Sequence, residues 1–120
     1  MPNSLLATAA IIGAVLALTA GLASPARADA PTTLTLTLRE HRFTPDTLTV
    51  AAGERFRLRI VNEDGATEEF DSEALGVERF ITPHGQATAE LGPLQPGIYT
   101  FMGEFHPLTA DGRIIVEARP

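Results

Sequence analysis

The sequence contains no cysteine, no lysine and no tryptophan among its 120 residues. Without cysteine the chain cannot form a disulfide, a thiolate metal ligand, a cysteine nucleophile or a cysteine-linked lipid anchor. The 9 basic residues are all arginine and are outnumbered by 15 acidic residues, which gives a formal net charge of −6. Binding to nucleic acid is not expected, because phosphates require a basic face. The composition favours a soluble protein that tolerates cations.

The N-terminal segment is predicted to be a targeting signal. The first 26 residues carry no charged side chain, and most of them form an apolar run of 19 residues. Small residues at Ala26 and Ala28 match an A-x-A cleavage site, which predicts a signal peptide over residues 1–28 and a mature chain from Asp29. The segment lacks early basic residues and is long enough to span a bilayer, so an uncleaved anchor is the alternative. Either way we expect a periplasmic domain that does not itself insert into the membrane.

The rest of the chain alternates between apolar and polar residues in short segments separated by turn signals. In "RFRLRIV", for example, Leu58 and its apolar neighbours share one face, while Arg57 and the other arginines share the opposite face. The predicted strands are residues 33–38, 46–50, 55–61, 77–82, 86–91, 98–102 and 113–118. The acidic stretch 62–76 shows no clear alternation and is expected to contain a loop or a helical turn. About seven strands in one domain, residues 29–120, predict an all-β fold of two packed antiparallel sheets.

Three segments carry a resemblance to a known family. "FTPDTLTVAAGERFRLRIVN" (43–62) resembles the opening half of a cupredoxin, and "LQPGIYTFMGEFH" (94–106) resembles its closing half. "GRIIVEA" (112–118) resembles the last strand, so the resemblance covers nearly the whole mature chain. It implies a cupredoxin-like Greek-key β-sandwich with a ligand loop that ends in His106.

Two positions depart from the copper-binding pattern of that family. Gly103 stands where the family has its cysteine ligand, and the first histidine ligand falls near Glu68. A blue (type 1) copper site needs a thiolate and two imidazoles, so this chain cannot be a blue-copper electron carrier. The fuller pattern "EEFDS…GPLQPGIYTFMGEFHP" resembles EfeO-type cupredoxin-like proteins, which are exported domains found with bacterial iron permeases. That resemblance implies iron or copper handling in high-affinity iron uptake, with an inner-membrane iron permease or another periplasmic uptake component as partner.

Glu68, Glu104 and His106 are the principal candidate metal ligands. His106 holds the family's ligand position, and imidazole binds copper, iron and zinc alike. Glu104 lies two residues earlier, and Glu68 replaces a family histidine; carboxylates favour a harder ion such as iron over Cu(I). The alternatives are a loop histidine bonded to a backbone carbonyl and solvated surface carboxylates.

Three further residues are weaker candidate metal ligands. Glu69 is one residue out of the family's register, so only one of Glu68 and Glu69 should reach the metal. Met102 offers a thioether, but its parity in the strand directs it to the other face. His41 precedes the first family motif and could close a second site, but a surface role is favoured. His84 is interpreted as a turn residue.

Three functions are compatible with these residues. The first is a metal-binding module that holds iron or copper, with the identity of the ion open. The second is a metal-free interaction module that docks on a permease or partner protein. The third is a copper-dependent ferroxidase, but few soft ligands are present, so binding is favoured over catalysis. No Ser–His–Asp arrangement or phosphate-binding loop indicates another enzyme class.

Overall fold

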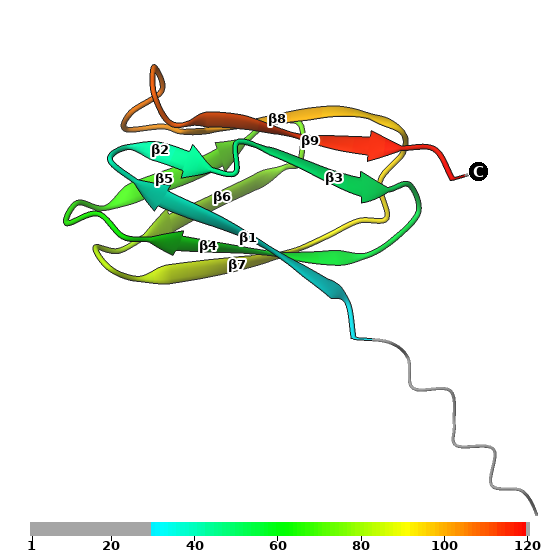
Figure 1. The fold of residues 1–120 in the computed structure, drawn as a ribbon, viewed down its shortest axis with the longest axis horizontal. Helices are drawn as coiled ribbons and strands as arrows, with labels where there is room; N and C mark the ends of the chain where they lie inside the picture. The colour runs from blue at the N-terminus through cyan, green and yellow to red at the C-terminus, as the bar shows by residue number, and fades with distance from the viewer. Residues whose placement is uncertain (1–29, 120) are drawn as a thin grey trace, which may run out of the picture.

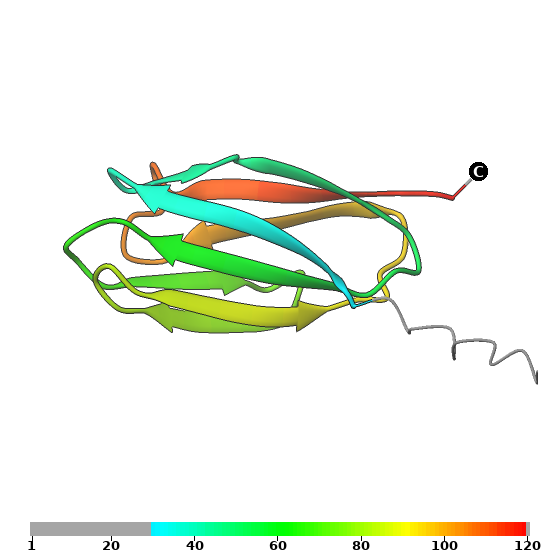
Figure 2. The same cartoon turned by 60° about the horizontal axis from the view of Figure 1, so that its bottom comes forward.

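The computed structural model describes residues 30–119, and the predicted signal peptide over residues 1–28 lies outside the described residues. Its strands are β1 (Thr32–Arg39), β2 (Arg42–Thr44), β3 (Thr47–Ala51), β4 (Phe56–Asn62), β5 (Glu68–Ser72), β6 (Val77–Ile81), β7 (Gln86–Leu91), β8 (Gly97–Gly103) and β9 (Asp111–Glu117). They form a four-stranded sheet, β2-β1-β4-β7, and a five-stranded sheet, β3-β9-β8-β5-β6. The two sheets pack face to face (Figures 1 and 2). Residues 30–119 contain no helix that is long and apolar enough to cross a membrane.

The prediction of an all-β sandwich is confirmed, and each predicted strand is present with ends that agree to within about two residues. The expectation of purely antiparallel sheets is wrong, because β1–β4 and β3–β9 are parallel pairs. The reason is that the chain crosses from the four-stranded sheet to the five-stranded sheet between β2 and β3. The change places β3 beside the C-terminal strand instead of beside its neighbours in sequence.

Two strands escaped the sequence analysis. The expectation of a loop or helical turn over residues 62–76 is wrong at its centre, where β5 pairs with both β6 and β8. Glu68, Glu69, Phe70 and Ser72 of β5 are all buried, so this strand shows no simple alternation of apolar and polar residues. β2 has only three residues, which is too short for a periodic signal.

The core lies between the sheets and follows the alternation of the strands. Leu58 is fully buried while Arg57 is exposed, as the sequence predicts, and Leu34 is only partly buried at the open start of β1. The buried apolar residues are Leu36, Leu38, Phe43, Leu48, Phe56, Leu58, Ile60, Phe70, Val77, Ile81, Ala89, Leu91, Phe101, Ala110, Ile114 and Val116. Burial of this apolar surface is the main stabilising contribution in a domain without disulfides.

Three connections meet at one end of the sandwich: the β1–β2 turn, the β4–β5 loop and the β8–β9 loop (Figures 1 and 2). Phe43, Phe70 and Phe101 pack against one another in the core, with ring centroids 5.1–6.0 Å apart. Phe43 lies two residues after His41 of the β1–β2 turn, Phe70 two residues after Glu68, and Phe101 two residues before Gly103 at the end of β8. The aromatic cluster therefore anchors the three segments that carry the candidate site.

Candidate metal centre

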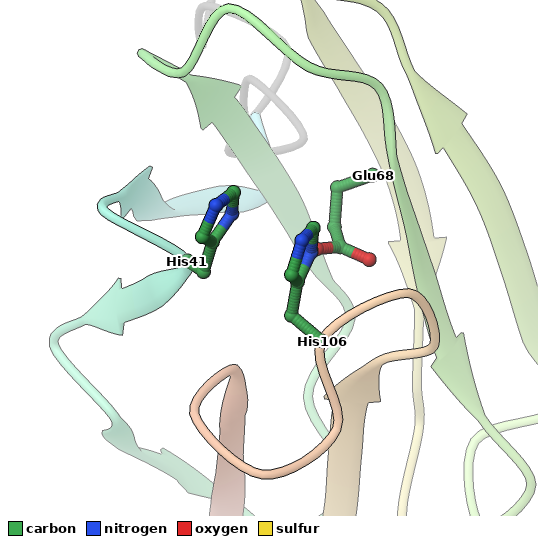
Figure 3. Close-up of side chains that lie close together, drawn as sticks. All are labelled: His41, Glu68 and His106. Carbon is green, nitrogen blue, oxygen red and sulfur yellow. The ribbon is translucent and has the colours of Figure 1, made fainter.

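His41, Glu68 and His106 come together at this end of the sandwich (Figure 3): His41 lies in the β1–β2 turn, Glu68 is the first residue of β5, and His106 lies in the β8–β9 loop. One potential ligand atom of each residue lies within 4.8 Å of the others. Of the principal candidates, the structure brings Glu68 and His106 together. It adds His41, which the sequence analysis ranked lower, and it places Glu104 elsewhere.

The Glu68 carboxylate is held firmly in this group. Glu68 is only 1% exposed, and its Oε2 lies 2.5 Å from Nδ1 of His106. Its Oε1 accepts hydrogen bonds from the backbone N–H groups of Phe105 at 2.9 Å and of Glu69 at 3.1 Å. A buried carboxylate requires such partners, because burial removes its hydration. These bonds direct the carboxylate toward the two imidazoles, as Figure 3 shows.

Gly103 makes room for this carboxylate. A Cβ atom at position 103 would lie 2.7 Å from Cδ of Glu68 and 2.8 Å from Cβ of Ala110. The Glu68 carboxyl group thus occupies the space that a cysteine side chain would need at the position of the family's thiolate ligand. A thiolate copper site does not fit this chain, whereas the imidazole and carboxylate donors present are suited to iron or to copper without sulfur.

His41 reaches the site from an unusual turn. Glu40 and His41 have φ angles of 51° and 57°, and Asp64 of the β4–β5 loop accepts hydrogen bonds from both of their backbone N–H groups. Burial acts to raise the pKa of Asp64, but these two donors and the positive charge of nearby imidazoles outweigh it and lower this pKa below its usual value. The His41 ring stacks on the His106 ring, with centroids 3.6 Å apart and an interplanar angle of 12°.

Glu104 belongs to a second group, with Glu69 and Glu78, whose carboxylate oxygens lie within 4.8 Å of one another. Glu69 belongs to this second group because Glu68 and Glu69 point to opposite faces of β5. Glu104 is separated from His106 by a tight turn, in which the N–H of His106 donates to the carbonyl of Gly103. Burial raises the pKa of Glu69 above its usual value, and the negative charge of nearby Glu104 raises this pKa further.

The remaining candidates lie in neither group. Met102 is 41% exposed on the outer face of β8, where it pairs with Asp71 and Asp111, and this is the face that its parity predicts. His84 lies in the β6–β7 turn. Sequence reasoning missed Glu78, and the alternation of the predicted strand gives no signal for it, because its face also carries Phe80.

The fold is a β-sandwich of the cupredoxin type. It has two packed sheets with parallel strand pairs, and possible metal ligands gather at one end of the sandwich. Residues 11–116 match the family model for the cupredoxin-like domain, and the chain belongs to that family. It is 41% identical over 81 residues to Uncharacterized protein RP394 of Rickettsia prowazekii (strain Madrid E). The match covers 68% of this chain and 65% of that relative, so the chain spans less than two thirds of the relative's length.

Solved structures of amicyanin share the fold. Amicyanin from Paracoccus versutus (Thiobacillus versutus) gives a TM-score of 0.57 at 18% identity, covering 74% of this chain and 86% of that one. A Cu(I) amicyanin mutant gives a TM-score of 0.57 at 14% identity, covering 71% and 82%. At this level of identity the likeness concerns the fold alone.

Proposed function

We propose that this protein binds an iron or copper ion through His41, Glu68 and His106 and handles that metal outside the inner membrane. The observation that carries the proposal is the convergence of two imidazoles on one buried carboxylate, with ligand atoms within 4.8 Å of one another. Two histidines and one carboxylate are a donor set of non-haem Fe(II) sites, and imidazole also suits Cu(II).

Metal binding requires a small rearrangement of this group. Metal bonds to histidine nitrogen and carboxylate oxygen are about 2.0–2.2 Å long, so two such donors on one ion lie about 3 Å apart or more. The Nδ1 of His106 and Oε2 of Glu68 are 2.5 Å apart. The imidazole must therefore move away from Glu68, or bind through Nε2. His106 lies on a partly exposed loop, which leaves it room to do so.

The cellular setting is part of the same proposal. The apolar N-terminal segment supports export to the periplasm, as a signal peptide or as an anchor. The resemblance to EfeO-type domains supports a role in iron uptake beside an inner-membrane permease or another uptake component. The family assignment supports a metal-related role in general, and the exclusion of a thiolate site separates this chain from the blue-copper carriers.

The Glu69, Glu78 and Glu104 group is a second candidate site, for a hard cation such as iron. Glu69 is 8% exposed, and among residues 30–119 its carboxylate forms no ion pair with arginine or histidine. Glu78 and Glu104 are exposed, and carboxylates that lie this close to a buried one repel it unless a proton or cation compensates their charge. Oxygen-only ligands favour hard ions.

Replacing His106 tests the first site. Loss of ligand-supporting residues commonly weakens metal binding about 10–100-fold, so His106→Ala should weaken it by about 100-fold or more. The measurement is titration of the purified protein with Cu(II), Cu(I), Fe(II), Mn(II) and Zn(II). His84→Ala is the matched control and should leave every titration unchanged. If His106→Ala leaves the affinity for every metal unchanged, the proposal fails and the interaction-module function takes its place.

The copper-loaded protein should show only weak visible absorption. The chain has no cysteine, so the intense charge-transfer band from thiolate to Cu(II) has no donor. An absorption spectrum of the Cu(II)-saturated protein checks this, and an intense blue or green adduct would contradict it. The same sample, mixed with Fe(II) and oxygen, tests the ferroxidase alternative through catalytic turnover.

A further inference from the structure

The backbone conformation of the turn that carries His41 must be held by contacts with other parts of the chain. Glu40 and His41 both have left-handed backbone conformations, with φ of 51° and 57°, which residues other than glycine rarely adopt. Two such residues in succession persist only where surrounding contacts hold them. Neither is a glycine, so the conformation of the turn is imposed by the tertiary structure.

Asp64 provides that restraint. Its Oδ1 accepts the backbone N–H of Glu40 at 2.7 Å, and its Oδ2 accepts that of His41 at 3.0 Å. The same Oδ2 lies 3.5 Å from Nδ1 of the His41 ring. One carboxylate thus engages both left-handed residues and the imidazole itself, and its negative charge makes these bonds stronger than neutral ones.

Asp64 is in turn fixed to the core by Asn62. The backbone N–H of Asp64 donates to Oδ1 of Asn62 at 2.9 Å, and Asn62 is 1% exposed. Nδ2 of Asn62 lies within hydrogen-bond distance of the carbonyls of Ala66, Ile81 and Thr82, at 2.8–3.1 Å. A chain of hydrogen bonds therefore connects the end of β4 and the last residue of β6 to the position of the His41 ring.

We propose that Asp64 is the positioning residue that brings His41 into the metal site and so sets a donor set of two imidazoles and one carboxylate. The inference rests on the proposed metal-binding function. Without the Asp64 carboxylate the turn relaxes to ordinary backbone conformations, and His41 leaves His106. The site then keeps one imidazole and Glu68, a harder donor set. Asp64 therefore also influences which ions the site prefers.

Asp64→Ala tests the inference first in the metal-free protein. Parallel rings 3.6 Å apart shift each other's NMR signals, so the imidazole C–H signals of His41 and His106 should both move in this variant. Glu63→Ala removes the neighbouring carboxylate, which is exposed to solvent, and should move neither set of signals. Unchanged His41 and His106 signals in folded Asp64→Ala would overturn the inference.

The copper-loaded protein gives a second readout that mere destabilisation would not change. Nitrogen splittings in the Cu(II) EPR spectrum should correspond to two imidazoles in the parent protein and one in Asp64→Ala, with Cu(II) affinity about 10–100-fold weaker. Asp64→Asn keeps one acceptor oxygen and should lose less. It also supplies a folded variant if Asp64→Ala is unstable.

The outcomes separate this inference from the function on which it rests. If His106→Ala weakens Cu(II) binding but Asp64→Ala keeps two nitrogen ligands and full affinity, the inference is overturned and the proposed function stands. If His106→Ala leaves every metal titration unchanged, the proposed function fails, and the inference fails with it.

Discussion

Phe70→Ala is expected to lower the free energy of unfolding by about 3–5 kcal/mol. Phe70 is fully buried on β5, and its ring centroid lies 5.1 Å from that of Phe101 and 6.0 Å from that of Phe43. Truncation removes a large apolar side chain, opens a cavity and abolishes both aromatic contacts. Small domains are stable by about 5–15 kcal/mol, so the loss is a large fraction of the total.

Phe80→Ala is the matched control for this prediction. Phe80 lies on the neighbouring strand β6 and is 64% exposed, so its loss should change the free energy of unfolding by no more than about 0.5 kcal/mol. Denaturant unfolding measures both variants, and an unchanged m-value would show that stability alone has changed. Equal costs for the two phenylalanines would mean that the inward and outward faces of β5 and β6 are assigned incorrectly.

Gly103→Ala should destabilise the protein by about 1–3 kcal/mol, the usual effect of overpacking a filled interior. The new Cβ would meet Cδ of Glu68 at 2.7 Å and Cβ of Ala110 at 2.8 Å. The backbone cannot easily withdraw, because the N–H of Gly103 donates to the carbonyl of Ala110 at 2.7 Å and residue 103 pairs with Phe70 across β5 and β8. Chemical denaturation provides the measurement.

Two comparisons identify the cause of this effect. Gly65→Ala places its Cβ in open space and should change the free energy of unfolding by no more than about 0.5 kcal/mol. In a Glu68→Ala background, Gly103→Ala should cost less than it does alone, because one of its two clashes has been removed. If Gly103→Ala costs the same in both backgrounds, the Glu68 carboxyl group is not what fills the space beside Gly103.

The local alternation of the sequence determined most of the strands and the direction of their side chains. Phe56, Leu58 and Ile60 face the core because successive residues of a strand point to opposite sides, and this period of two is visible in the sequence itself. The absence of cysteine likewise excluded a thiolate ligand without any structure. Strand β5 could not be predicted from the sequence, because it is paired on both sides and buries carboxylates on both faces, so no alternation is visible.

Only the tertiary structure decides which side chains join the group around Glu68 and which join the group around Glu69. Glu104 and His106 are close in sequence, yet a tight turn at Gly103 sends their side chains to different groups. His41 and His106 are far apart in sequence, yet their rings stack. Their contact depends on the change of sheet after β2, on the packing of one sheet against the other, and on the bonds from Asp64 to the turn at Glu40 and His41. Short-range spacing carries none of this information, because side-chain direction in a loop depends on backbone dihedrals that distant residues impose.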